Sequence, residues 1–277
     1  MSISTVSSPL RWFGGKAKLV KHLLPFIPPH ISYLEPFSGG ASLLFAKPPS
    51  AVETLNDLDG GIANFYRVLQ NDNLFREFFH LVQVTPYSRE QYYEFLADWD
   101  FELNPARKAW KWFTVARQSF SGRFGSGISF CVEASGRGMS RSVIGWLSCI
   151  ERLPEIHERL RSVQVEQDDF RHVIARFNRP GVFMYADPPY VADTRTGGKY
   201  VVEMSYQDHR DLIGLLLDFN GKVLLSGYAN PLYEPLETAG WRRVDICVKL
   251  DAAMKTGEGT ADTRIETIWM NYDPPVA

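Results

Sequence analysis

The chain has 277 residues, of which 45% are hydrophobic and 22% charged, and its formal net charge is −2 at pH 7. These values match ordinary globular usage and exclude a disordered chain. The longest apolar runs, such as residues 212–217, fall far short of the roughly 20 residues that span a bilayer, and the first ten residues lack the pattern of a secretory signal. We therefore expect a cytoplasmic protein with one large domain, an insertion and no membrane segment.

The three cysteines of the chain, Cys131, Cys149 and Cys247, are far apart in the sequence. They form no C-x-x-C pair and have no histidine at ligand spacing. The sequence therefore predicts reduced thiols rather than a disulfide framework or a structural zinc site, and we expect no bound metal.

Short apolar runs rich in strand-forming residues recur along the chain, with amphipathic helical stretches between several of them. The predicted strands lie at 31–34, 52–55, 163–165, 182–185 and 223–225, and the clearest helices at 62–69 and 208–218. Strands that alternate with helices predict an α/β fold with a parallel sheet covered on both faces. Residues 71–141 interrupt this alternation, are rich in aromatic residues and are mostly helical in pattern, so we interpret them as an insert. Their tail, 119–138, is dense in Ser, Gly and Arg, which favours a hairpin or loops.

The first predicted strand is followed by Glu-Pro-Phe-Ser-Gly-Gly-Ala-Ser at residues 35–42, which precedes a helix predicted to begin near Ala41. Small residues let the backbone approach a ligand closely at a helix N-terminus. The pattern is not G-x-G-x-x-G, which argues against a nicotinamide cofactor. A simple tight turn between strand and helix is the alternative interpretation.

The second predicted strand ends in Asn-Asp-Leu-Asp at residues 56–59. A carboxylate in this position can accept hydrogen bonds from ribose hydroxyls, as in dinucleotide-binding folds. Alternatively, Asp57 or Asp59 caps the helix that starts near Gly60. One of the two can cap while the other binds.

A basic segment lies within and just after the insert. Residues 104–145 contain seven basic residues and one acidic residue, a net of +6, so the rest of the chain carries −8. A basic segment on an acidic body attracts a phosphate backbone to one face. A solvated basic surface is the alternative.

The tetrapeptide Asp187-Pro188-Pro189-Tyr190 directly follows the predicted strand 182–185. Ligands of open α/β sheets bind at the carboxyl ends of the strands. The two prolines fix the backbone and leave carbonyl acceptors beside a carboxylate and an aromatic ring. This set suits an amine attached to a flat ring, such as N6 of adenine: Asp187 and the Pro188 carbonyl would bond the amine, and Tyr190 would stack on the base.

Near the N-terminus, residues 11–16 read Arg-Trp-Phe-Gly-Gly-Lys. With this element, the loop 35–42, Asp57 and the Asp-Pro-Pro-Tyr tetrapeptide in this order, the chain resembles the Dam-type family of DNA N6-adenine methyltransferases. Residues 224–228 and 264–272 also resemble the late strands of that family. The resemblance implies a Rossmann-like S-adenosylmethionine-dependent methyltransferase sheet in a catalytic domain of residues 1–70 and 142–277, and a mostly helical target-recognition insert of residues 71–141.

The resemblance also implies a cofactor, S-adenosylmethionine, and a partner, double-stranded DNA. The residues expected to bind the cofactor are Trp12, Lys16, Glu35, Pro36, Phe37, Ser38, Gly39, Asp57, Asp169, Phe170 and Asp187. The residues expected to be catalytic are Asp187, Pro188, Pro189 and Tyr190. The residues expected to bind DNA are Arg117, Ser119, Ser121, Arg123 and Arg137. Asp169 and Phe170 would hold the adenine of the cofactor.

The expected reaction is direct methyl transfer to an adenine flipped out of the duplex, without a covalent intermediate, because none of the cysteines follows a proline as a cytosine-C5 nucleophile would. The target sequence stays open, because Ala116 and Ser121 replace two asparagines common in the family and residues 123–126 depart from its hairpin. Adenine methylation of RNA, cytosine-N4 methylation and an inactive DNA-binding homologue are the alternatives. Asp rather than Ser or Asn before the prolines favours adenine, and the oligomeric state is not predicted.

Overall fold

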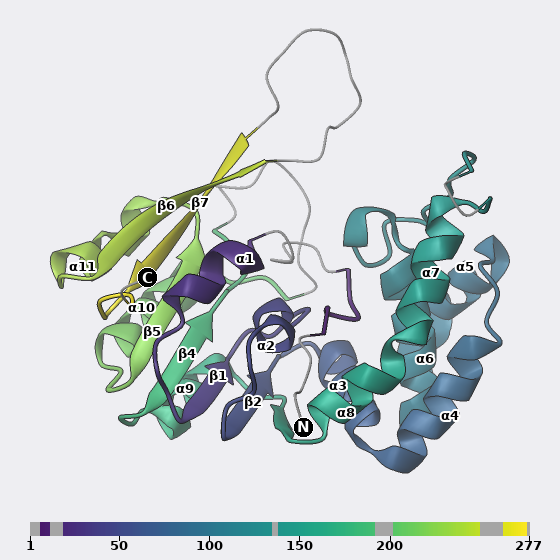
Figure 1. Cartoon of the computed structure of the whole chain (residues 1–277), viewed down its shortest axis with the longest axis horizontal. Helices are drawn as coiled ribbons and strands as arrows, with labels where there is room; N and C mark the ends of the chain where they lie inside the picture. Colours follow the sequence, from purple (N-terminus) through teal and green to yellow (C-terminus); the bar gives the residue numbers. More distant parts are fainter. Residues whose placement is uncertain (1–5, 12–18, 135–137, 192–201, 250–262, 276–277) are drawn as a thin grey trace, which may run out of the picture. The chain divides into compact units, whose positions relative to one another are not determined.

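The structure is a computed structural model that describes residues 6–11, 19–134, 138–191, 202–249 and 263–275. Within these ranges the strands form one seven-stranded sheet in the order β3-β2-β1-β4-β5-β7-β6 (Figure 1). The strands are β1 (Ser32–Glu35), β2 (Val52–Asn56), β3 (Val163–Glu166), β4 (Val182–Ala186), β5 (Lys222–Gly227), β6 (Arg242–Lys249) and β7 (Thr263–Met270). All five strands predicted from the apolar runs are present, and the α/β class is confirmed.

The sheet is mixed. β1 runs parallel to both β2 and β4, and β4 runs parallel to β5, as the alternation of strands and helices predicted. β7, by contrast, is antiparallel to β5 and to β6. The two C-terminal strands follow one another as an antiparallel pair, which needs no crossover helix, so the alternation rule does not apply to them.

The chain forms two compact units. The first comprises residues 1–15, 39–49 and 57–167, and the second comprises residues 16–38, 50–56 and 168–277. The helices of the first unit are α2 (Ser42–Ala46), α3 (Gly60–Gln70), α4 (Asp72–Gln83), α5 (Arg89–Asp98), η2 (Trp99–Phe101), α6 (Pro105–Gln118), η3 (Phe120–Gly122), α7 (Arg141–Glu151) and α8 (Leu153–Leu160). The helices of the second unit are α1 (Val20–Leu23), η1 (Leu24–Phe26), α9 (Phe170–Phe177), α10 (Tyr206–Leu217), η5 (Pro231–Tyr233) and α11 (Glu234–Thr238).

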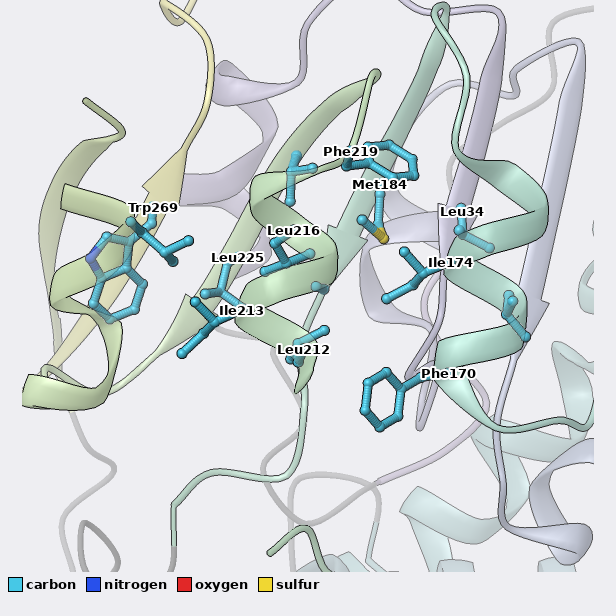
Figure 2. Close-up of a cluster of buried hydrophobic side chains, with 14 of the residues drawn as sticks. Leu34, Phe170, Ile174, Met184, Leu212, Ile213, Leu216, Phe219, Leu225 and Trp269 are labelled. Atoms are coloured by element: carbon cyan, nitrogen blue, oxygen red, sulfur yellow. The ribbon is translucent and has the colours of Figure 1, made fainter. Parts of the chain in front are cut away.

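The core of the second unit lies between its strands and the helices α9 and α10. Figure 2 shows Ile174 of α9 and Leu216 of α10 near Met184 of the central strand β4, and all three side chains are buried. Every residue of β4 is buried, which explains why its sequence is a continuous apolar run. A capping box between Ser205 and Asp208 begins α10 and fixes where the helix starts.

The first unit has an aromatic core. Phe65 of α3 stacks on Phe113 of α6 with their ring centroids 5.1 Å apart, and Phe78 of α4 meets Phe65 edge-on at 5.8 Å. Most of the aromatic residues of the predicted insert therefore serve packing. The helical interpretation of the insert is confirmed as far as Gln118. After that residue an antiparallel bridge between Ser119 and Ile128 forms a short hairpin.

Most of the longer helices begin at a side-chain cap, as α3 does at Asp59 and α10 at Ser205, and the described helices are of modest length. Across the described part of the chain, each one is too short or too polar to traverse a lipid bilayer.

Candidate active site

The carboxyl ends of four neighbouring strands of the second unit lie at one edge of the sheet. Strands β1, β2, β4 and β5 are mutually parallel, so the residues that end or follow them gather there. Glu35 ends β1, Asn56 ends β2, Asp187 follows β4, and Tyr228 follows β5. This is the edge at which open α/β sheets bind ligands, and it is the candidate active site.

The carboxylate of Asp187 accepts a hydrogen bond from one buried hydroxyl group, which is itself bonded to a second. The hydroxyl of Ser226 donates to Oδ1 of Asp187 at 2.8 Å and lies 3.1 Å from the hydroxyl of Tyr185. Burial, followed by the charge of Asp187, raises the pKa of Tyr185 well above its usual value, so this phenol stays protonated. Because Ser226 donates to Asp187, Tyr185 is the donor to Ser226. The two hydroxyls thus fix the orientation of the carboxylate.

The aromatic ring of Tyr190 is held at its far end. Its hydroxyl donates to Oε2 of Glu266 at 2.7 Å, and both side chains are buried. The ring meets that of Tyr228 nearly edge-on, with centroids 4.6 Å apart and an interplanar angle of 71°. Burial, then the charges of Asp187 and Glu266, raises the pKa of Tyr190 well above its usual value. Of the two prolines between Asp187 and Tyr190, Pro188 is buried and Pro189 is half-buried.

The loop after β1 is tied to the end of β2 by the buried amide of Asn56. Its Nδ2 donates to the carbonyl of Pro36 at 2.9 Å and to the carbonyl of Asp168 at 3.0 Å, and its Oδ1 accepts from the Asp168 amide at 2.9 Å. The backbone carbonyl of Asn56 accepts from the Ser38 amide at 2.8 Å. Glu35, which opens this loop, is buried and accepts from the hydroxyl of Tyr33 at 2.7 Å.

Two aromatic rings and a carboxylate lie beside this loop. The rings of Phe37 and Phe170 have centroids 5.2 Å apart. Asp169 caps α9 by accepting from the amide of Arg171 at 2.8 Å. The guanidinium of Arg171 lies over Phe170 at 4.5 Å and also donates to Asp169 at 3.0 Å. The same guanidinium pairs with Asp208 and Asp211 of α10, which fastens the start of α9 to the start of α10.

The predicted ligand-binding residues of the first unit bond to one another. Oδ2 of Asp57 accepts from the Gly39 amide at 2.8 Å, and Oδ1 accepts from the Asp59 amide at 3.0 Å. Asp59 caps α3 through the Gly61 amide at 2.8 Å, so Asp59 is the capping residue of the two candidates. Gly39 and Ala41 both have a positive φ, of 45° and 48°, and the helix that follows Ala41 has only five residues.

Four of the five predicted DNA-binding residues are described, and they lie at the end of α6 and in the hairpin after it. Arg117 is half-buried and donates to the carbonyl of Gly145 at 3.0 Å, and burial lowers its pKa. Ser119 is buried, and its hydroxyl donates to the carbonyl of Val115 at 2.8 Å. Ser121 and Arg123 are exposed, and Ser121 has a positive φ of 55°.

Three of the predicted site residues cannot be placed. Trp12, Lys16 and Arg137 lie outside the described residues. Among the residues that are described, no group of three or more His, Cys, Asp or Glu side chains is arranged to hold a metal ion.

Sequence reasoning missed several residues at this edge of the sheet. Ser226 and Tyr228 end or follow β5, and Glu266 lies in the neighbouring β7. Asn56 directly precedes Asp57, but the sequence pattern assigned a role only to the aspartates of this segment. For Ser226 and Tyr228 the available signal was their place at the end of an apolar strand, the same signal that identified Asp187.

Comparison with known proteins shows what the chain is similar to. A family model described as D12 class N6 adenine-specific DNA methyltransferase matches residues 12–245. A curated relative, the Type II methyltransferase M1.LlaDCHI of Lactococcus lactis subsp. cremoris, is 27% identical over 246 residues, which make up 82% of this chain and 82% of the relative.

Proposed function

The chain belongs to the D12 class N6 adenine-specific DNA methyltransferases, and from this membership we propose that it takes a methyl group from S-adenosylmethionine and places it on N6 of an adenine flipped out of duplex DNA. The protein is an enzyme that methylates adenine in DNA, and its mixed seven-stranded sheet is consistent with a Rossmann-like methyltransferase. The proposal adds the identity of the methyl donor, the double-stranded form of the DNA and the residues involved.

The residues of the second unit fit the proposed donor. The rings of Phe37 and Phe170 lie close together and beside the carboxylate of Asp169, a combination that suits a flat purine with an exocyclic amine. Glu35 supplies a buried carboxylate at the end of β1. S-adenosylmethionine would supply an electrophilic methyl group on a cationic sulfur. Phe37, Asp169 and Phe170 would hold its adenine, and the loop from Glu35 to Ser38 its amino-acid part.

The remaining cofactor contacts are proposed on the resemblance alone. In the first unit they are Gly39 and Asp57, whose mutual hydrogen bond gives the loop a fixed shape. Trp12 and Lys16 complete the proposed set.

The methyl acceptor would be bound by the Asp-Pro-Pro-Tyr segment. The N6 amine of adenine is a weak nucleophile because its lone pair is delocalised into the ring. Hydrogen bonds from N6 to Asp187 and to the Pro188 carbonyl would orient that lone pair towards the methyl group, while Tyr190 stacks on the base. Positioning of this kind can lower a reaction barrier by roughly 7–11 kcal/mol.

One observation carries the proposal. A carboxylate and an aromatic ring three residues apart are each fixed by buried hydrogen bonds, Asp187 by Ser226 and Tyr190 by Glu266. A site that binds the amine with one group and the base with the other needs both to be rigid, since small displacements from the reactive geometry are costly.

Residues 71–141 are proposed as the target-recognition insert of a catalytic domain formed by residues 1–70 and 142–277. The net charge of +6 on residues 104–145 supports contact with the DNA backbone. The proposed contacts are Arg117, Ser119, Ser121, Arg123 and Arg137. The designation of the relative as a Type II methyltransferase supports methylation at a defined DNA site, in a restriction-modification setting.

The test is transfer of labelled methyl from S-adenosylmethionine to unmethylated duplex DNA, followed by nucleoside analysis. We expect N6-methyladenine from the wild type and at least a hundredfold loss of rate in Asp187→Asn. Asp218→Asn, an exposed acid at the end of α10, serves as the charge-matched control and should retain the wild-type rate. Label found in RNA, in N4-methylcytosine or in no product despite DNA binding would each refute the proposal.

A further inference from the structure

The position of Glu266 follows from the pairing of β5 with β7. Gly227 of β5 pairs with Thr267 of β7, so the next step of the same antiparallel register places Glu266 opposite Tyr228. The side chain of Glu266 is only 6% exposed. A carboxylate buried to this extent in a sheet is costly unless hydrogen-bond donors contact it.

Two phenol groups donate to this one carboxylate. The hydroxyl of Tyr190 donates to Oε2 of Glu266 at 2.7 Å, and the hydroxyl of Tyr228 donates to Oε1 at 3.5 Å. The planes of the two rings make an angle of 71°, and the hydroxyl groups of both rings bond to the same carboxylate. Glu266 of β7 therefore holds the ring of Tyr190 at its hydroxyl end, while the backbone of Tyr190 holds the other end.

The bond from Tyr190 to Glu266 restricts a motion that the two prolines leave free. The two prolines before Tyr190 restrict the backbone, but they do not fix the side-chain torsions of the tyrosine. A ring that must stack on an incoming base has to present its face at one angle. A hydrogen bond at the hydroxyl and an edge-on contact with Tyr228 together leave one orientation.

We propose that Glu266 is a positioning residue for the transfer reaction, which holds the rings of Tyr190 and Tyr228 at the angle that receives the flipped adenine. The inference rests on the proposed function and deepens it. Glu266 acts only through the two tyrosines and touches neither the methyl group nor N6. Its removal therefore lowers the rate of transfer and leaves binding of the methyl donor unchanged.

The decisive experiment is a double-mutant cycle of Tyr190→Phe and Glu266→Leu, with kcat and KM measured for DNA and for S-adenosylmethionine. Tyr190→Phe keeps the ring and removes only the hydroxyl. Each single variant should lower kcat/KM for DNA by at least about tenfold, as expected for a hydrogen bond to a charged group, with KM for S-adenosylmethionine unchanged. The double variant should be no worse than the weaker single variant, because both remove the same bond.

A conservative variant separates positioning from charge. In Glu266→Gln the amide oxygen can accept from Tyr190 and the amide nitrogen can donate to the hydroxyl of Tyr228, so activity should stay within about threefold of the wild type. Glu234→Gln, at an exposed position in α11, is the matched control. A loss in Glu266→Gln as large as in Glu266→Leu would show that the charge, and not the two bonds, matters, and would overturn the inference.

A spectroscopic signal reports the ring directly. With 2-aminopurine at the target position, stacking on the tyrosine quenches the fluorescence of the flipped base. The Glu266→Leu complex should be brighter than the wild-type complex at saturating DNA. Equal brightness together with wild-type kcat would overturn the positioning role while leaving the proposed function intact. Absence of methyl transfer by the wild type itself would overturn both.

Discussion

The hydroxyl of Ser226 donates a hydrogen bond of 2.8 Å to the carboxylate of Asp187, across 39 residues of sequence. Ser226 is fully buried at the end of β5, so its hydroxyl has a fixed position beside the half-buried carboxylate of Asp187. Ser226→Ala should therefore lower kcat by about tenfold, equivalent to about 1.4 kcal/mol. Ser162→Ala, at an exposed position, is the control and should not change kcat. A wild-type kcat in Ser226→Ala, measured by the methyl-transfer assay, would show that Asp187 keeps its orientation without the bond to Ser226.

The buried amide of Asn56 joins the loop after β1 to Asp168. Asn56→Ala removes three hydrogen bonds of 2.9–3.0 Å and leaves backbone groups of Pro36 and Asp168 without these partners. The free energy of unfolding should fall by about 2–3 kcal/mol, at about 1 kcal/mol for each bond. Urea denaturation provides the measurement. Asn73→Ala, at an exposed position in α4, should change the same quantity by less than about 0.5 kcal/mol.

Gly61 of α3 leaves room for the indole of Trp112. A Cβ at this position would lie 2.2 Å from Nε1 and 2.5 Å from Cδ1 of that buried ring. Gly61→Ala should therefore lower the free energy of unfolding by about 1–3 kcal/mol, despite the higher helix propensity of alanine.

A matched glycine in another helix tests the opposite sign. Gly214 of α10 is exposed, and a Cβ there meets no atom within 4 Å. Gly214→Ala should raise the free energy of unfolding by about 0.5–1 kcal/mol. A change of the same sign in both variants would contradict the packing argument.

Arg171 lowers the pKa of Asp208 to about 2, with a further contribution from Ser205. The pKa is lower in the folded protein than in the unfolded chain, so the resulting stability is fully present above about pH 4 and is lost as the pH falls towards 2. Asp208→Asn should lower the free energy of unfolding by up to about 1 kcal/mol at pH 7, since the pair is partly exposed, and by progressively less between pH 4 and 2. An effect of Asp208→Asn on the free energy of unfolding that stays constant from pH 7 to pH 2, measured by urea denaturation, would contradict this assignment.

Arg123 is exposed in the hairpin after α6, whereas Arg117 is half-buried and bonded to a backbone carbonyl. Arg123 is therefore the cleaner probe of contact with the DNA backbone. Arg123→Ala should weaken binding to all duplex sequences alike and reduce the slope of log affinity against log salt by about 0.9. Arg210→Ala, at an exposed position in α10, should leave the slope unchanged. An unchanged slope in Arg123→Ala would remove this residue from the proposed interface.

The strands of the parallel part of the sheet could be predicted from the sequence because each is marked by a short apolar run of its own residues. Residues 182–185 form a continuous apolar run. Such a run is typical of a strand that is buried on both faces of the sheet, and β4 is such a strand. β6 gave no comparable signal. Its residues are mostly exposed, so the strand depends on pairing with β7, which comes later in the chain and cannot be read from either segment alone.

The same distinction separates the predicted from the missed site residues. Asp187 and Tyr190 lie within one tetrapeptide after one strand, and this local pattern was enough to single them out. Tyr190 meets Glu266 across 76 residues, and only the register of β7 brings the two together. For Ser119, the sequence did not predict that the hydroxyl donates to the carbonyl of Val115 in the preceding helix, and its contact with DNA stays a prediction.

The order of the strands also bears on how the protein is made. Of the strands that the structure describes, β7 is synthesised last, yet it lies between β5 and β6 in the sheet. β6 has no neighbour in the sheet until β7 is synthesised, and the carboxylate that anchors Tyr190 arrives with the same strand. A nascent chain that already carries the Asp-Pro-Pro-Tyr segment thus lacks a fixed tyrosine. We therefore expect full competence to modify DNA only after β7 has been synthesised and has paired with β5.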